Sequence, residues 1–424
     1  MTARPTPSAR PPLRPLDEAV ADLLAQALPL DEVQSIPTFD ADGRVLAQDL
    51  VSSLDVPGHD NSAMDGYAVR IADLVATDTL AVSQRIPAGS AAQPLAAKSA
   101  ARIFTGAPVP PGADAVVMQE ATEVLPDSAQ VRVLAAPEPG QWIRRRGEDV
   151  ARGAVVLPRG SRLTPASLGL AASIGFAQLT VSRPVRVALF STGDELVMPG
   201  DMPAEQLPAG AIFNSNRFFL RGLLKRLGCE VTDLGIVPDQ RQVTIDALAA
   251  AAREHDLILT SGGVSVGEED HIKPAVEALG ELMLWQIAMK PGKPFAYGRV
   301  RRPAPSAGSA DFAHFIGLPG NPVSSFVTFL LLVRPFLLKL QGATDVLPQA
   351  MPAVAGFSWP KADKRREFLR VQQTARGGLA LFENQSSGVL TSAVWGDGLV
   401  DNPPGQIITP GSIVQYIPFS ALLS

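Results

Sequence analysis

The chain has little of what builds a metal cage: among its 424 residues there is one cysteine, Cys229, and there are four histidines. A single cysteine forms no internal disulfide and cannot supply a cysteine-based zinc or iron–sulfur site. A hard cation held by carboxylate and carbonyl oxygens remains open, because such a site needs neither residue. Any bound metal is therefore expected to resemble Mg²⁺.

An excess of positive charge is also missing. The chain carries 37 Lys and Arg against 42 Asp and Glu, a formal net charge of −5. This balance argues against a nucleic-acid partner, which requires clustered cations. Charged residues make up 19% and apolar residues 46% of the chain, as in ordinary folded proteins. This composition excludes disorder as the overall state.

Long apolar runs are lacking as well. The strongest run, Phe326–Val333, is closed by Arg334 and Pro335 and is too short to cross a bilayer. Residues 1–15 contain no apolar core of the kind found in a signal peptide. We therefore expect a cytoplasmic protein with no membrane partner.

Changes in residue pattern along the chain predict a multi-domain fold of the α/β plus β class. Residues 14–43 and 151–183 are expected to form a discontinuous linker module that begins with a helix over 16–28. Short β-branched runs broken by Gly and Pro predict a β-rich module over 44–150. Alternating strands and helices predict a doubly wound α/β domain over 184–341, with a parallel sheet covered on both faces. The remaining short strands predict a β-barrel over 345–424.

Three strands of the predicted α/β domain run into unusual loops. VRVALF leads into Ser191–Glu195, DLILT leads into Ser261–Gly267, and FIGLP leads into Gly320-Asn321-Pro322. The carboxyl ends of parallel strands meet at one edge of a sheet, so these loops should open together. Glycine-rich backbone and a helix start suit a phosphate. A tight turn is the alternative for any single loop, and neither a Walker A motif nor G-x-G-x-x-G is present.

Charged side chains crowd the same loops. The acidic residues there are Asp194, Glu195, Asp239 and residues 268–270. Acidic side chains suit an anion site only if a divalent cation lies between them and the anion. Helix capping is the alternative, and we favour it for Glu268 and Glu269. Lys290 and Lys293 stand in a proline-stiffened KPGKP segment that suits an anion, unless they are simply solvated.

Two segments of the β-rich module are ambiguous. Arg144, Arg145 and Arg146 precede Glu148 and Asp149, an arrangement that suits either an oxyanion site or a self-neutralising surface turn. Asp65-Gly66, taken alone, is typical of a hairpin turn.

Taken together, the segments resemble one family. DNSAMDGYAVR, TGAPVP, QWIRRRGED, ALFSTGDEL, SGGVSVGEED, KPGKPF and GLPGNPVS occur in the order and at about the intervals of molybdopterin molybdenumtransferases, the MoeA family, to which the E domain of gephyrin is similar. The likeness runs from about Leu16 to the C-terminus. It implies an elongated four-part subunit whose α/β domain binds molybdopterin.

The resemblance also implies site residues by motif position. Its catalytic acids fall on Asp65, Asp149, Glu195 and Asp270, and Glu195 and Asp270 are the expected Mg²⁺ ligands. Residues implied to bind substrate are Thr105, Thr192, Gly193, Asp239, Ser261, Gly262, Gly263, Ser265, Lys290, Lys293, Pro319 and Asn321. The C-terminal match is weaker, and there the candidates are Arg366 or Arg370 and Ser386 or Ser387.

The implied reaction is Mg²⁺-dependent: adenylylated molybdopterin and molybdate give molybdenum cofactor, AMP and water. A homodimer is implied, with Asp65 and Asp149 reaching the site across it, and contact with the molybdopterin adenylyltransferase is a further expectation. The alternatives are an adenylyltransferase-type activity and a non-catalytic scaffold on the same fold. His271 and the insertion 301–310 depart from the family pattern, and His271 is a candidate to alter the pH response.

Overall fold

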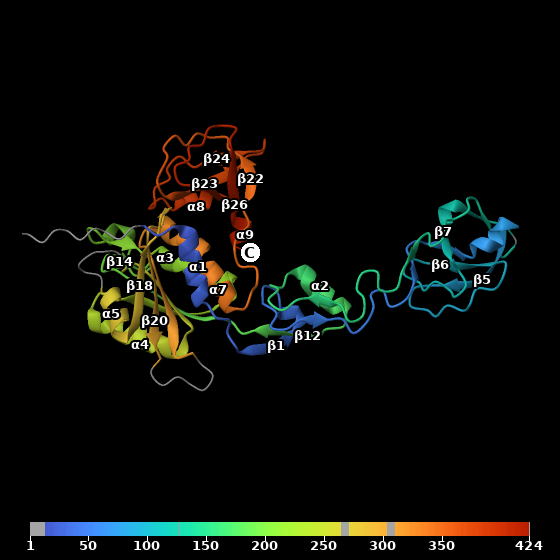
Figure 1. Cartoon of the computed structure of the whole chain (residues 1–424), viewed down its shortest axis with the longest axis horizontal. Coiled ribbons are helices and arrows are strands. Elements are labelled where there is room, and N and C mark those ends of the chain that lie inside the picture. The colour runs from blue at the N-terminus through green and yellow to red at the C-terminus, as the bar shows by residue number, and fades with distance from the viewer. Residues whose placement is uncertain (1–12, 127, 264–270, 303–309, 424) are drawn as a thin grey trace, which may run out of the picture.

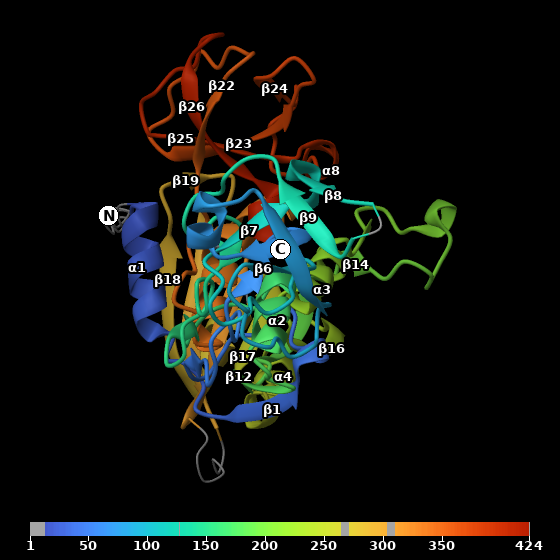
Figure 2. The same ribbon diagram turned by 90° about the vertical axis from the view of Figure 1, so that its right-hand side faces the viewer.

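The computed structural model describes residues 13–126, 128–263, 271–302 and 310–423. Its parts are strung out along one axis (Figure 1). The α/β domain and the C-terminal domain lie at one end, the β-rich module lies at the other, and two thin sheets with helix α2 connect them. Figure 2 shows the molecule end-on, with the β-rich module in front.

A six-stranded sheet in the order β16-β13-β17-β21-β20-β18 forms the α/β domain. Four strands are parallel: β13 (Arg186–Thr192), β16 (Glu230–Val237), β17 (Leu257–Ser261) and β21 (Phe312–Leu318). β20 (Pro294–Arg301) runs antiparallel to β21, and β18 (Gly280–Gln286) runs antiparallel to β20, so only β20 is reversed relative to the four parallel strands. The sequence pattern did not predict this reversal. It follows from the connection between β18 and β20, which has no room for a crossover helix.

Helices cover both faces of this sheet, which confirms the doubly wound prediction. One face packs on α4 (Arg241–Glu254) and α5 (Ile272–Leu279), and the other on α3 (Asn216–Arg226), α6 (Pro322–Thr328) and α7 (Arg334–Leu340). Helix α1 (Leu16–Gln26) also packs on the second face, through Leu16, Ala19 and Leu23. This corrects its predicted place in the linker module: its apolar stripe is buried against the α/β core.

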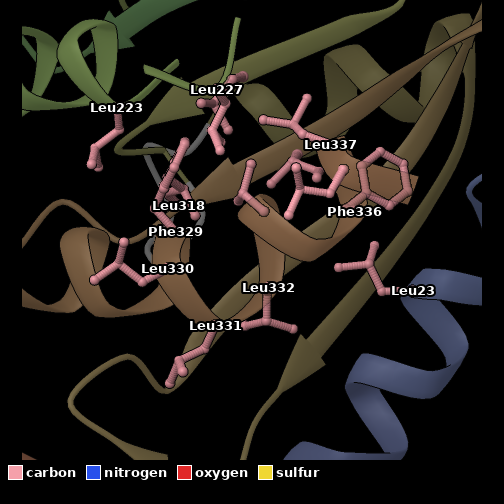
Figure 3. Close-up of a cluster of buried hydrophobic side chains, with 14 of the residues drawn as sticks. Leu23, Leu223, Leu227, Leu318, Phe329, Leu330, Leu331, Leu332, Phe336 and Leu337 are labelled. Atoms are coloured by element: carbon pink, nitrogen blue, oxygen red, sulfur yellow. The ribbon is translucent and has the colours of Figure 1, made fainter. Parts of the chain in front are cut away.

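A continuous helical stretch covers Pro322–Leu340, but its middle, Phe329–Val333, is a π-helical segment. Pro335 has no N–H and so cannot form the backbone hydrogen bond that an α-helix would require at this turn, which is consistent with the π-helical geometry there. By length and composition Pro322–Leu340 could cross a membrane, yet 94% of it is buried inside the protein. Figure 3 shows its side chains among leucines of neighbouring elements, including Leu23 and Leu223.

Small sheets connect the two ends of the molecule. β1 (Val33–Pro37) pairs with β12 (Gln178–Ser182), and β2 (Leu50–Val51) pairs with β11 (Val155–Leu157), so segments far apart in sequence form one module with α2 (Pro165–Ser173). Thr164 caps α2 through its side chain, which accepts from the N–H of Ser167.

The β-rich module is a six-stranded sheet in the order β7-β4-β6-β5-β9-β8. Its strands are β4 (Gly66–Val69), β5 (Thr79–Ile86), β6 (Ser99–Ile103), β7 (Ala115–Met118), β8 (Thr122–Val124) and β9 (Gln130–Val133). A short ladder of β3 (Asn61–Ser62) and β10 (Ile143–Arg144) stands beside it. Its buried side chains form two clusters, which are separate from the core of the α/β domain.

The C-terminal domain is a small barrel. Its sheet runs β19-β23-β25-β26-β22, β24 pairs with β23, and a bridge between Ala355 and Leu379 joins the two ends. The strands are β22 (Met351–Val354), β23 (Arg366–Gln373), β24 (Leu379–Leu381), β25 (Gly398–Asn402) and β26 (Ile413–Pro418), with helices α8 (Thr391–Trp395) and α9 (Phe419–Leu423). β19 (Met289–Lys290) belongs to the KPGKP segment of the α/β domain, so the barrel sheet extends into that domain.

Candidate functional site

The three glycine-containing loops lie at one edge of the α/β sheet, as expected. Ser191 of β13 is in register with Ser261 of β17, which is in register with Leu318 of β21. Thr192 is likewise in register with Val237, so Asp239, two residues beyond β16, belongs to the same edge. The predicted substrate-binding residues at this edge are therefore Thr192, Gly193, Ser261, Gly262, Gly263, Pro319 and Asn321.

Two glycines allow these loops to touch. Gly262 has φ +94°, and a Cβ on it would lie 2.6 Å from the Thr192 carbonyl oxygen. Gly263 has φ +67°, and a Cβ there would lie 2.7 Å from Thr192 Oγ1 and 2.6 Å from Ile272 Cγ1. A side chain at either position would therefore clash as well as strain the backbone. The glycines bring the β13 and β17 loops into direct contact.

Asn216, the first residue of α3, connects the end of β17 to the loop that follows β21. Its side chain is buried, with 8% of the residue exposed, and Nδ2 donates to Ser261 Oγ (2.8 Å) and to the Gly320 carbonyl (2.7 Å). Sequence reasoning missed this residue and read it only as a helix start. Buried amide side chains are uncommon and need hydrogen-bond partners, so an Asn beside the apolar face of a helix was the sequence signal that could have identified this residue.

Several hydroxyls near this edge are buried without a hydrogen-bond partner in the described part of the chain. They are Ser191 Oγ and Thr192 Oγ1 at the end of β13, and Ser325 Oγ and Thr328 Oγ1 in α6. An unsatisfied buried polar group costs about 1–3 kcal/mol, so such groups usually have water or ligand partners. The edge thus has unused hydrogen-bonding capacity.

Three of the predicted acids at this edge are described. Asp194 and Glu195 are exposed, and the Glu195 carboxylate lies against Gly193, where a Cβ would come within 2.6 Å of Oε2. Asp239 is half-buried. Asp270, Ser265, Glu268 and Glu269 lie outside the described residues. The described residues contain no group of three or more His, Cys, Asp or Glu that could hold a metal ion, so Mg²⁺ ligation stays a prediction.

The KPGKP segment packs along α6, which follows Asn321. A Cβ on Gly292 would lie 2.4 Å from Oγ1 of Thr328, the last residue of α6, and 3.5 Å from the carbonyl oxygen of Ser324 in its first turn. The two lysines of the segment differ. Lys290 Nζ donates to Glu367 Oε1 (2.9 Å) and lies 3.7 Å from Asp363, whereas Lys293 has no ion-pair partner among the described residues.

Lys290 therefore forms part of a domain junction. Glu367 is 1% exposed, and its Oε2 accepts hydrogen bonds from Trp359 Nε1 (2.7 Å) and Asn402 Nδ2 (3.4 Å). The Lys290 ammonium also lies over the Trp359 ring, 5.7 Å from its centroid. Because a buried carboxylate already compensates Lys290, Lys293 is the lysine with charge to spare for an anion.

The C-terminal candidates divide in a similar way. Arg366 forms ion pairs with Asp401 (2.5 Å) and Asp17 (2.7 Å). Arg370 is 1% exposed and bonds Ser392 Oγ (3.0 Å) and the Ser386 carbonyl (3.3 Å), with no acidic partner in the described part of the chain. Burial lowers the pKa of Arg370 to about 10.

The loop of Ser386 and Ser387 reaches the α/β domain. The Ser387 carbonyl accepts from the N–H of Val323 (2.9 Å), in the first turn of α6. Arg370, through its bond to Ser386, is thereby connected to the Asn321 loop at the sheet edge.

Asp65 and Thr105 adjoin β4 and β6 of the β-rich module, which lies beyond the linker module from this edge (Figure 1). Asp149 lies next to Val150, whose side chain packs in the linker module. Asp65 Oδ1 accepts from both the N–H and Oγ1 of Thr105, each at 2.8 Å. These backbone and hydroxyl bonds lower the pKa of Asp65. Asp149 is exposed, and its N–H donates to the Val56 carbonyl. One chain does not bring these residues to the glycine loops.

The arginine segment nearby is tied to acids outside its own turn. Arg145 pairs with Asp60 and Arg146 pairs with Asp55, each at 2.6 Å. Of the two readings of this segment, the geometry favours the neutralised surface turn for these two arginines. Arg144 is exposed and remains open to other partners.

Comparison with known families covers nearly the whole chain. Residues 14–175 match the MoeA N-terminal region (domain I and II), residues 188–339 a probable molybdopterin binding domain, and residues 352–419 the MoeA C-terminal region (domain IV). A molybdopterin molybdenumtransferase from Haemophilus influenzae is 44% identical over 357 residues, covering 84% of this chain and 85% of that protein. The chain belongs to the molybdopterin molybdenumtransferase, or MoeA, family.

Further relatives agree with MoeA membership. Molybdopterin molybdenumtransferase 2 from Mycobacterium tuberculosis is 37% identical and covers 91% of this chain and 93% of that protein. The crystal structure of a molybdopterin biosynthesis MoeA protein from Pyrococcus horikoshii superposes with a TM-score of 0.81 at 28% identity, covering 96% of this chain and 100% of that one. The MoeA resemblance read from the seven motifs is confirmed.

Proposed function

We propose that this chain inserts molybdenum from molybdate into adenylylated molybdopterin, releasing AMP and forming molybdenum cofactor. The observation that supports this most directly is the convergence of the β13, β17 and β21 loops at one sheet edge, in a chain of the molybdenumtransferase family. Both substrates are anionic. An edge with glycine backbone, spare hydroxyl donors and Lys293 suits their phosphate and oxyanion groups.

The residues of this chain have separable roles in the proposal. Backbone N–H groups of Gly263 and of the Asn321 turn hold the pyrophosphate, since the Gly262 N–H already donates to the Leu318 carbonyl at 3.1 Å. Lys293 compensates charge on the leaving AMP or on molybdate, and Asn216 keeps two of the loops at a fixed separation. The dithiolene sulfur atoms that bind molybdenum belong to the substrate, so no nucleophilic side chain is required.

The residues present suit a magnesium ion. Glu195 offers an exposed carboxylate at the edge, with no ion-pair partner in the described part of the chain, and oxygen donors are what Mg²⁺ prefers. Glu195 and Asp270 would hold it. When bound, the ion supplies charge stabilisation to the phosphate oxygens.

A homodimer completes the proposal. Asp65 and Thr105 are held together at the end of the molecule remote from the glycine loops. In the proposed dimer, the β-rich module of a second copy brings them to the sheet edge. Contact with the adenylyltransferase that makes the substrate remains a prediction.

The test is AMP release from adenylylated molybdopterin, measured with and without molybdate in the presence of Mg²⁺. The proposal expects release that depends on molybdate, reduced at least about 100-fold by Glu195→Ala and by Asp270→Ala. Glu205→Ala, which removes an exposed carboxylate ten residues after Glu195, is the matched control and should keep full activity. ATP consumption with molybdopterin alone would instead support the adenylyltransferase, and absence of any turnover would support a scaffold.

A further inference from the structure

The sheet edge opposite the glycine loops carries a second concentration of charge. A cavity of about 410 Å³ lies where the chain passes between the α/β domain and the linker module. Four arginines line it: Arg183, Arg186, Arg299 and Arg302. None of them belongs to the proposed substrate site, because Arg186 begins β13 while the glycine loop follows the other end of that strand.

Two of these arginines are fully engaged in holding the fold. Arg183 donates to both carboxylate oxygens of Asp256, at 2.6 and 3.0 Å, and its Nε lies 3.0 Å from Glu32. Arg302 donates to the His255 carbonyl at 2.8 Å, and only 5% of its side chain is exposed. These contacts fix the linker module to the sheet and leave neither residue free for a ligand.

The other two have hydrogen-bonding capacity to spare. The nearest carboxylate oxygen to Arg186 Nη2 is 3.6 Å away, on Asp256, and 37% of this side chain is exposed. The Arg299 guanidinium lies over the Phe312 ring, 4.4 Å from its centroid, and donates to Gln26. In the described part of the chain, Nε of both arginines is buried without a hydrogen-bond partner.

The charges around the cavity do not cancel. Asp256 is the buried acid, and its carboxylate is shared by three guanidiniums, those of Arg183, Arg186 and Arg302. Asp31 and Glu32 also line the cavity, and both are exposed, so solvent screens their charges. With four arginines against three acids, the lining has a formal surplus of one positive charge. His314 adds no charge, since burial lowers its pKa to about 4. The cavity is therefore positive in a chain whose net charge is −5.

The two available arginines approach the cavity from different sides. Arg186 immediately precedes Val187 in β13, and one register row across four strands runs through Val187, Leu257, His314 and Arg299. Three inter-strand steps separate the first from the last, about 14 Å. A ligand between them needs acceptor oxygens on more than one side, as a phosphate group has and a single carboxylate does not. Leu28, Leu30 and Phe312 supply apolar surface beside the cations.

We propose that this cavity binds a phosphate monoester with an apolar substituent, held through Arg186 and Arg299. It is a second ligand site, separate from the molybdopterin edge and independent of the proposed function. Its position at the junction with the linker module allows an occupant to stiffen the joint between the two halves of the molecule.

Calorimetric titration of the full chain with phenyl phosphate, at constant ionic strength, tests this. We expect saturable binding with a Kd on the order of 1 mM or tighter. Arg186→Gln and Arg299→Gln should each weaken it by about tenfold or more, since each removes charge-assisted hydrogen bonds. The control Arg376→Gln, at an exposed turn of the C-terminal barrel, should bind like the wild type.

Two further titrations separate the parts of the ligand. Inorganic phosphate should bind more weakly than phenyl phosphate, and equal affinity would contradict the apolar half of the site. If wild type and both arginine variants bind phenyl phosphate equally, the binding is assigned to the glycine loops and the proposal is overturned. The absence of saturable binding also overturns it. If a Gln variant fails to fold, Arg186→Lys, which keeps the charge with fewer donors, should still bind more weakly than wild type.

Discussion

Asn216 has the most consequential position at the residue scale, because one buried amide joins two loops that come from different strands. Its Nδ2 donates to Ser261 Oγ and to the Gly320 carbonyl. Substitution leaves these acceptors without a donor in a buried place. An effect on both stability and substrate binding follows from the same two hydrogen bonds.

We predict that Asn216→Ala lowers the free energy of unfolding by about 1–3 kcal/mol and raises the KM for adenylylated molybdopterin. Urea unfolding and steady-state AMP release measure the two effects. Gln242→Ala, which truncates an exposed amide on α4, is the control and should change neither. An Asn216→Ala protein with wild-type stability and KM would show that the loops are held by other contacts.

Asp65 and Thr105 give a prediction about pH. Hydrogen bonds from the backbone and hydroxyl of Thr105 lower the folded-state pKa of Asp65, so their stabilising effect is present above the unfolded pKa, about 3.9. It is lost as the pH falls through the lowered pKa. Thr105→Val removes the hydroxyl donor, so wild type should be more stable than the variant at neutral pH, with a difference that narrows under acid.

The same comparison in an Asp65→Asn background isolates this pair, because no carboxylate then titrates. Thermal unfolding between neutral and acidic pH measures both series. A Thr105→Val difference that varies equally with pH in both backgrounds would assign the effect to other groups.

At the scale of elements, the parallel strands β13, β17 and β21 set where the loops lie, and glycine sets how closely they approach. Gly262→Ala would bring a Cβ to 2.6 Å from the Thr192 carbonyl at a positive φ. We predict a folded protein destabilised by about 1–3 kcal/mol with strongly reduced AMP release. Gly169→Ala in α2, where a Cβ meets nothing within 4 Å, is the control and should keep full activity.

The strand–helix pattern was enough to predict the doubly wound domain and the shared loop edge. Continuous apolar strands, and the loops that follow them, can be recognised from local sequence. It could not predict that β20 and β18 run antiparallel, or that α1 packs on the α/β core, since both depend on long-range packing. The two lysines of KPGKP looked equivalent. Only the fold places Glu367 against Lys290 and leaves Lys293 without an ionic partner among the described residues.

At the scale of the whole molecule, the predicted site residues are spread over separate modules. Asp65 and Thr105 adjoin strands of the β-rich module, and the glycine loops belong to the α/β domain, with the linker module between these two parts (Figure 1). Motif spacing carries no distance information, and the sequence indicated this separation only through the family resemblance, which implied that Asp65 and Asp149 reach the site across a dimer. If a dimer unites the two parts, each site uses the β-rich module of one copy and the α/β domain of the other. Two variants that are inactive for different reasons should then rescue each other.

We predict that Asp65→Ala and Glu195→Ala are each inactive alone and that re-equilibrated mixtures recover about a quarter of wild-type AMP release, because half of the dimers are mixed and each has one intact site. A mixture of Asp65→Ala with Thr105→Ala is the control and should stay inactive, since both changes fall in the same module. No recovery in the first mixture would place each site within one chain.

The central claim is that the β13, β17 and β21 loops hold the substrate. A crystal structure of the chain with adenylylated molybdopterin tests it most directly. The account predicts the pyrophosphate within hydrogen-bond distance of the backbone N–H of Gly263 and near the Asn321 turn. A pyrophosphate bound elsewhere, with these loops unchanged and in contact only with one another, would contradict it.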